Sequence, residues 1–177
     1  SYDFFDRMGV TALPYGHSYM GGKMSIHSDY SDIPGYFDAL VDRHGKEKTI
    51  DVLSQNRHNT TIYPSFTIKD AIQALRVARP VSVGQTLIET YHLRLDGAPD
   101  ALLHRTITYS RLINSPASMV GPDDWDCYTR MQEALSSSTR DWVYLARYLH
   151  QEEPSAEGLK APGTSDLSAR NQFEAWL

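Results

Sequence analysis

Residues 75–95, LRVARPVSVGQTLIETYHLRL, contain two runs in which apolar side chains recur at every second position. Alternation of this kind, rich in β-branched and aromatic residues, is typical of strands that place one face against a core. Pro80 and Gly84 interrupt the pattern between the two runs, which favours a turn and an antiparallel hairpin. The same alternation precedes the hairpin within 62–68, so this part of the chain predicts an antiparallel sheet.

Segments with helical spacing lie on both sides of the predicted sheet. Within 31–56 the apolar residues recur every three or four positions, with an interruption at Gly45. Within 100–113 the same spacing returns after a turn that contains glycine and proline. We therefore expect helices in both regions.

A further helix is predicted to begin near Pro122, within residues 114–135 (NSPASMVGPDDWDCYTRMQEAL). Proline is tolerated in the first helical turn, and the carboxylates of Asp123 and Asp124 favour the positive end of the helix dipole. The following turns carry an apolar stripe that we expect to face the core: Tyr128, Met131 and Leu135. Taken alone, the two aspartates need do no more than cap this helix.

The two ends of the chain have weaker patterns. Residues 1–32 favour loops and short strands, and the polar stretch 151–166 favours a surface loop or tail. Residues 168–177 predict a short helix that docks through its apolar side chains, Phe173, Trp176 and Leu177. Together the patterns predict an α+β fold, with helices laid over one side of an antiparallel sheet.

Length and composition limit the classes of function. The 177 residues suffice for one domain, and 41% hydrophobic with 22% charged residues is ordinary for a soluble globular protein. A net charge of −5 argues against nucleic acid as a partner, and no apolar run approaches a membrane span of about 20 residues. The first residues show no secretory pattern, and Cys127 has no second cysteine to pair with, so we expect a cytoplasmic protein.

Four segments resemble, in the same order, parts of one family of enzyme subunits. The family is the large (alpha) subunit of Rieske non-haem iron ring-hydroxylating oxygenases, of the type that acts on benzoate, anthranilate and salicylate. The segments are 57–66 (RHNTTIYPSF), 77–93 (VARPVSVGQTLIETYHL), 121–132 (GPDDWDCYTRMQ) and 163–177 (GTSDLSARNQFEAWL). The resemblance implies a helix-grip (START-like) catalytic domain, in which a curved sheet wraps a long helix over a cavity.

The resemblance covers only part of such a subunit. A Rieske 2Fe-2S cluster needs two cysteines and two histidines, and Cys127 is the single cysteine of this sequence. The family also takes two iron-binding histidines from an Asp-x-x-His-x-x-x-x-His segment, and no pair among the seven histidines has that spacing. We therefore expect residues 1–177 to form the C-terminal portion of one incomplete catalytic domain, with the Rieske domain and its cluster belonging to the full-length subunit.

The resemblance also implies which residues bind iron and substrate. Asp124 matches the carboxylate ligand of the mononuclear Fe(II), a metal that families of this kind hold with two histidines and one carboxylate. Asp123 would then be a helix cap or a neighbour that orients the ligand. Asn59, Asn114 and Val120 match positions that line the family's substrate pocket. A strand-end hydrogen bond, a turn and an ordinary core valine are the simpler interpretations of these three.

Side chains of other types add weaker hypotheses. An amide at Asn114 would suit a substrate with a polar substituent, such as a carboxylate or a hydroxyl group. Arg57 and Arg79 have the side chain that holds a carboxylate through two parallel hydrogen bonds, although arginines more often serve as surface or cross-strand partners. For His17, a hydrogen-bonded loop position is favoured over a metal ligand.

By resemblance, the protein is an oxidoreductase that hydroxylates an aromatic ring, either a mono- or a dioxygenase. Its substrates would be O2 and a polar-substituted or carboxylated aromatic compound, with electrons from NAD(P)H through a reductase or ferredoxin and the Rieske cluster. Its assembly would be a homo-oligomer (a trimer) or a complex with a small beta subunit. We expect this chain alone to be inactive and to bind Fe(II) poorly.

Two other classes of protein remain compatible with the periodicity. A non-enzymatic START-like domain also encloses a small molecule between a sheet and a helix, but it has no need of Asp124 in its cavity. A structural subunit would instead bury Trp142, Tyr144 and Trp176 in a broad apolar contact and would have no cavity.

Overall fold

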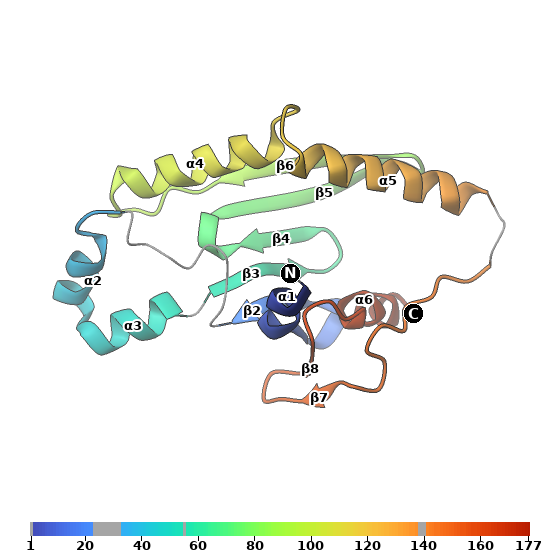
Figure 1. The fold of residues 1–177 in the computed structure, drawn as a ribbon, viewed down its shortest axis with the longest axis horizontal. Coiled ribbons are helices and arrows are strands. Elements are labelled where there is room, and N and C mark those ends of the chain that lie inside the picture. Colours follow the sequence, from blue (N-terminus) through green and yellow to red (C-terminus); the bar gives the residue numbers. More distant parts are fainter. Residues whose placement is uncertain (1, 23–32, 55, 138–140) are drawn as a thin grey trace.

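The computed structural model describes residues 2–22, 33–54, 56–137 and 141–177 and shows an antiparallel sheet flanked by helices (Figure 1). Its eight strands have the order β6-β5-β4-β3-β2-β1-β8-β7, and every neighbouring pair within these residues is antiparallel. The strands are β1 (Val10–Ala12), β2 (Ser18–Gly22), β3 (Asn56–Ile62), β4 (Phe66–Lys69), β5 (Ala74–Ser82), β6 (Gln85–His92), β7 (Glu153–Pro154) and β8 (Leu159–Ala161). The predicted α+β class is confirmed.

The helices lie around the sheet in separate groups. They are α1 (Tyr2–Met8), α2 (Tyr36–His44), α3 (Lys46–Ser54), α4 (Asp100–Asn114), α5 (Val120–Ser136) and α6 (Leu167–Trp176). Short 3-10 turns are formed by Pro14–Gly16 and Asp70–Ile72. In Figure 1, α4 and α5 follow one another alongside the β5–β6 hairpin, α2 and α3 lie at one end, and α1 lies by β2. Helix α6 packs on β1.

The periodicity located the central elements correctly. Ser82 pairs with Gln85, so β5 and β6 form the predicted hairpin around Val83 and Gly84. The predicted helices within 31–56 and 100–113 are present as α2, α3 and α4, and Gly45 ends α2 with a φ of 80° that only glycine adopts readily. Pro64 lies in the turn between β3 and β4, where its missing N–H breaks no strand pairing.

The ends of the chain form more regular structure than the sequence indicated. Residues 2–8 form α1 where loops and strands were expected, and the part of that prediction within 23–32 lies outside the described residues. The expected tail at 151–166 contains β7 and β8, and β8 extends the sheet by pairing with β1. Asp6 joins the two ends, because its carboxylate accepts hydrogen bonds from the Thr164 hydroxyl at 2.6 Å and from the Tyr148 hydroxyl at 3.0 Å.

The main buried cluster lies where α6 crosses β1 and β8. It consists of Val10, Ala12 and Leu167, with Ala161 packed against it. Asn171 of α6 donates hydrogen bonds from its amide nitrogen to the carbonyls of Leu13 and His17, at 3.0 and 2.8 Å. The docking helix is therefore confirmed, but its expected contacts were wrong, since Phe173, Trp176 and Leu177 are exposed.

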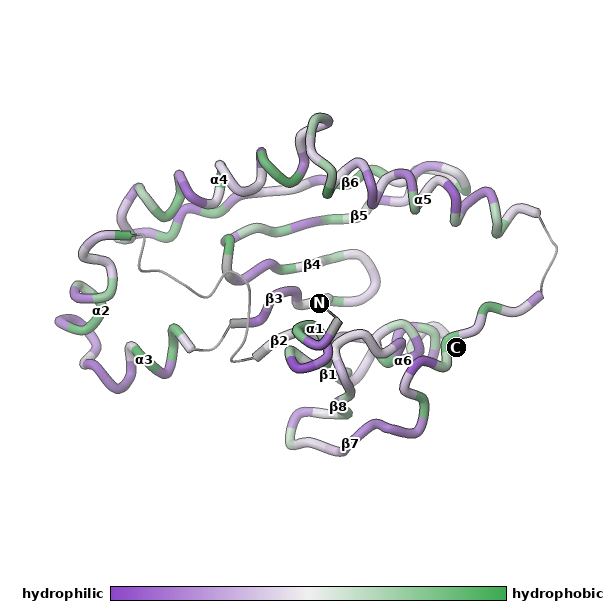
Figure 2. The backbone as a smooth tube through the Cα atoms, in the orientation of Figure 1, coloured by the Kyte–Doolittle hydropathy of each residue, from purple (hydrophilic) through white to green (hydrophobic). Residues whose placement is uncertain are grey.

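The apolar stripe of α5 is also uncovered, contrary to the sequence prediction. Tyr128, Met131 and Leu135 are 62%, 59% and 64% exposed, and hydrophobic and hydrophilic segments alternate along this helix in Figure 2. The chain exposes 12523 Å² in total. A folded monomer of 20.0 kDa exposes roughly 8700 Å². This chain therefore leaves exposed a large area of apolar surface that a complete folded monomer of its size would bury. No helix among the described residues is long and apolar enough to cross a membrane.

Candidate functional site

A cavity of about 1230 Å³ lies between one face of the sheet and helices α4 and α5. Strands β3 to β6 form its floor, and the second half of α4 and most of α5, from Val120 to Glu133, form its wall. We call it the sheet–helix cavity. The side chains in its lining that carry charge or polar groups include His58, Lys69, Arg76, Tyr109, Asn114 and Asp124.

The junction between α4 and α5 positions the wall of the cavity. A Cβ atom on Gly121 would lie 2.7 Å from the carbonyl oxygen of Ile113, so only glycine allows α5 to start this close to α4. The helix begins at Val120, two residues earlier than predicted, and the hydroxyl of Ser118 accepts the N–H of Val120 at 3.0 Å. Asp123 is therefore not the residue that caps this N–H group.

The helix start brings three of the four predicted site residues to one cavity. Asn114, Val120 and Asp124 all line it, whereas Asp123 does not. Asp124 lies one turn beyond Gly121, so its side chain faces the sheet across the cavity although the residue is exposed. Val120 is 49% exposed, which excludes the simpler interpretation as a core valine in this structure.

Asn59, the fourth predicted residue, is not among the described residues that line the cavity. Its neighbour His58 lines it instead, because β3 has an irregularity there: Met20 pairs with Asn59, but the next residue, Gly21, pairs with Arg57. A bulge of this kind redirects side chains. The Oδ1 atom of Asn59 is buried and has no hydrogen-bond partner among the described residues. Burial and the charge of Lys69 lower the pKa of His58.

Lys69 and Arg76 are cavity residues that the sequence analysis missed. Burial, and to a smaller extent the charge of Arg76, lower the pKa of Lys69 to about 8, and the carboxylate of Asp124 opposes the shift. Apolar side chains recurring at every second position, such as Leu75 and Val77, had suggested the core-facing side of β5. The cavity is lined instead by the intervening residues of the strand, Arg76 and Ala78. The charged side chain of Arg76, placed between two apolar residues of a strand, was the signal in the sequence that could have identified the cavity-facing side.

The guanidinium of Arg76 is held against the end of α4. It donates a hydrogen bond to Oδ1 of Asn114 at 3.3 Å. The amide nitrogen of Asn114 in turn donates to the carbonyl and the hydroxyl oxygen of Ser110, at 2.9 and 3.1 Å. These bonds fix which way the Asn114 amide points, with its oxygen toward Arg76.

The other candidate residues have partners elsewhere. Arg79 forms an ion pair with Glu89 on the neighbouring strand, and this interaction raises the pKa of Arg79. Arg57 lies over the ring of Tyr19, 4.2 Å from its centroid, and 3.9 Å from the carboxylate of Glu157. His17 accepts the N–H of Tyr63 through Nδ1 at 3.0 Å, in agreement with the hydrogen-bonded loop position favoured by the sequence.

The described residues do not make a complete metal site. Among them, no group of three or more histidine, cysteine, aspartate or glutamate side chains is close enough together to hold a metal ion. Asp124 offers one carboxylate toward the cavity and is electrostatically coupled to Lys69. A mononuclear iron with three protein ligands would therefore need further donors from outside the described residues.

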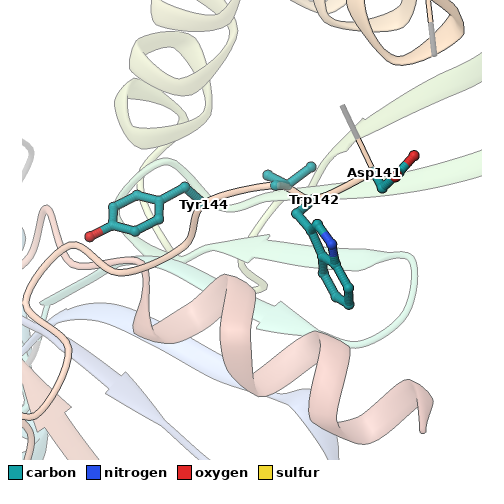
Figure 3. A pocket seen from close by; sticks show the side chains of 4 residues that line it. Asp141, Trp142 and Tyr144 are labelled. Carbon is teal, nitrogen blue, oxygen red and sulfur yellow. The ribbon is translucent and has the colours of Figure 1, made fainter. Parts of the chain in front are cut away.

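A second hollow, of about 410 Å³, is lined by Asp141, Trp142, Val143 and Tyr144. These consecutive residues belong to one extended segment, and Trp142 and Tyr144 point in different directions from it (Figure 3). Trp142, Tyr144 and Trp176 are exposed and form no broad apolar contact among the described residues. A structural subunit was also expected to have no cavity, and the sheet–helix cavity differs from that expectation.

Comparison with known proteins agrees with the resemblance in the sequence. The large subunit of 2-halobenzoate 1,2-dioxygenase from Burkholderia cepacia is 28% identical over 140 residues, which are 78% of this chain and 30% of that subunit. A structure of naphthalene 1,2-dioxygenase with indole in its active site matches with a TM-score of 0.72 and 14% identity, over 97% of this chain and 41% of the other. No family model matches the chain.

A mutant of naphthalene 1,2-dioxygenase bound to phenanthrene gives a TM-score of 0.64 with 13% identity, over 97% of this chain and 42% of the other. At these identities the structural matches establish the fold, which confirms the predicted sheet packed on helices. The similarity in sequence confirms the resemblance to large subunits of ring-hydroxylating dioxygenases. The chain spans about 30% of the curated relative's length.

Proposed function

We propose that this chain is the C-terminal portion of the catalytic domain of an aromatic-ring-hydroxylating oxygenase. The whole enzyme would hydroxylate a carboxylated or otherwise polar-substituted aromatic ring with O2. The observation that carries the proposal is that Asp124, the residue matching the family's carboxylate ligand, lines a large cavity between sheet and helices. Asn114 and Val120, which match substrate-pocket positions, line the same cavity.

Asp124 would be one ligand of a mononuclear Fe(II), the cofactor that activates dioxygen in such a site when it is bound. The other ligands would be histidines from outside the described residues, since these residues hold no cluster of three candidate donors. In this arrangement Asp124 supplies a negative charge to one wall of the cavity. Val120 and Ile88 offer apolar contact for a ring, and Asn114 offers a polar contact for its substituent.

The uncovered apolar stripe of α5 supports the view that more polypeptide packs on this chain. Met131 and Leu135 would lie against the remainder of the catalytic domain or against another subunit, whereas Tyr128 faces the sheet–helix cavity. We propose that the assembly is a homo-oligomer (a trimer) or a complex with a small beta subunit. Electrons would come from NAD(P)H through a reductase or ferredoxin and a 2Fe-2S Rieske cluster of the full-length subunit, in the cytoplasm.

Two adjacent aspartates provide a matched test in the full-length enzyme. Asp124→Ala should lower the content of mononuclear iron and reduce ring hydroxylation by at least about 100-fold, because one metal ligand is lost. Asp123→Ala, which changes a residue outside the cavity, should keep the iron content and the hydroxylation rate within about threefold of the wild-type values. Iron is measured by elemental analysis and hydroxylation by product formation. Equal activity in the two variants would refute the role of Asp124.

The alternative is a non-enzymatic START-like domain that binds a small molecule, which the size of the cavity also favours. In that case an aromatic ligand would bind equally well to the wild type and to Asp124→Ala, and neither protein would hydroxylate it.

A further inference from the structure

Arg76 combines a cationic side chain with a place in the sheet–helix cavity. It is half-buried on β5, between Thr67 of β4 and Thr90 of β6, and all three residues line the cavity. Thr67 and Thr90 carry no charge, so the two residues that pair with Arg76 give its guanidinium no counter-ion. A half-buried cation of this kind is costly unless something negative binds to it.

The hydrogen-bonding capacity of Arg76 is only partly used. One terminal nitrogen donates to Oδ1 of Asn114, and Nε is buried without a hydrogen-bond partner among the described residues. Within the described ranges, no aspartate or glutamate lies at ion-pairing distance from Arg76. A planar guanidinium presents its donors in pairs that match the two oxygens of a carboxylate.

Asn114 makes Arg76 a fixed rather than a mobile donor. Its amide is held by two hydrogen bonds to Ser110 and presents its oxygen to Arg76. Lys69 adds a second cation nearby, since the charge of Arg76 acts on it. The other arginines considered for this role, Arg57 and Arg79, have carboxylate partners of their own.

We propose that Arg76, oriented by Asn114, binds the carboxylate of an aromatic acid in the sheet–helix cavity and thereby selects carboxylated substrates. This inference rests on the proposed function for the identity of the ligand as a substrate. The aromatic ring would lie between Arg76 on the sheet and Val120 and Asp124 on α5, because all of these line the same cavity.

The test compares benzoate with its neutral isostere benzamide in the full-length enzyme. Affinity is measured by calorimetric titration, and hydroxylation is measured as kcat/KM for each compound. Arg76→Gln should lower the affinity and kcat/KM for benzoate by about 10- to 100-fold, because a charge-assisted hydrogen-bonding pair is lost. Its effect on benzamide should stay within about threefold. Arg79→Gln on the same strand is the matched control and should leave both compounds unaffected.

Two further variants distinguish a loss of carboxylate binding from a folding defect in Arg76→Gln. Asn114→Asp is isosteric and would pair with Arg76 internally, so it should weaken benzoate binding about as much as Arg76→Gln does. Arg76→Lys keeps the charge but not the paired donors, so its affinity for benzoate should lie between that of the wild type and that of Arg76→Gln. Equal losses for benzoate and benzamide in these variants would overturn the proposal, and so would unchanged benzoate affinity.

The binding and turnover measurements separate this inference from the proposed function. If the enzyme hydroxylates no aromatic compound but loses benzoate affinity in Arg76→Gln, the carboxylate site stands and the proposed reaction fails. If benzoate is hydroxylated equally well by wild type and Arg76→Gln, the proposed function stands and Arg76 is not the carboxylate site.

Discussion

Replacing Lys69 by methionine should stabilise the protein at neutral pH. The pKa of Lys69 falls from 10.5 to about 8 on folding, mainly because burial disfavours its charged form. A shift of that size corresponds to about 3 kcal/mol, and solvent screening of a half-buried side chain reduces it to about 1–2 kcal/mol. Methionine has a similar length and no charge, so Lys69→Met should raise the free energy of unfolding by that amount at pH 7.

The pH dependence of this effect has a definite sign. Between the folded pKa of about 8 and the unfolded value of 10.5, the unfolded chain binds the proton more readily than the folded one. The destabilisation by Lys69 is therefore complete below pH 8 and disappears as the pH rises toward 10.5. The difference in unfolding free energy between Lys69→Met and wild type should shrink accordingly.

Urea unfolding of the full-length protein, followed by tryptophan fluorescence at pH 7 and pH 10, measures both effects. Lys48→Met, on the exposed surface of α3, is the matched control and should change the unfolding free energy by less than about 0.5 kcal/mol at either pH. A Lys69→Met protein that is less stable than wild type at pH 7 would refute the reasoning. It would mean that the charge of Lys69 is stabilised in the folded cavity.

Two further substitutions test the framework around the cavity. Gly121→Ala should destabilise the protein by about 1–3 kcal/mol in thermal unfolding, because its Cβ would lie 2.7 Å from the Ile113 carbonyl oxygen. Gly84→Ala, with open space around it, is the control, and equal melting temperatures for the two variants would contradict the close approach of α4 and α5. Asn171→Ala should cost about 1–3 kcal/mol and speed hydrogen exchange in α6, because two hydrogen bonds to the Leu13 and His17 carbonyls are lost. Unchanged exchange in α6 would show that these bonds do not hold the helix.

The elements that the sequence predicted best are those whose own residues specify them. The β5–β6 hairpin has period-two alternation and Gly84 at its turn, and α4 has a continuous helical stripe. By contrast, β7 and β8 are two and three residues long and exist because β8 meets β1, more than 140 residues earlier in the chain. Local patterns carry little information about pairings over such distances.

The candidate site was predictable where it lies on a recognisable segment. Asp124 lies in the segment 121–132 that resembles the oxygenase family, Asn114 and Val120 lie shortly before that segment, and all three line the cavity. Arg76 was missed because the apolar residues on the other face of β5 suggested the core. The stripe of α5 was expected to be buried, but amphipathic spacing does not reveal which polypeptide covers it.

The position of the Asp124 carboxylate in the full-length, iron-loaded enzyme is the most direct test of the central claim. An experimentally determined structure of that enzyme should show an Asp124 oxygen bound directly to the mononuclear iron, on the side of the cavity formed by α5. An iron whose ligands do not include Asp124, or an Asp124 carboxylate turned away from the cavity, would contradict the account.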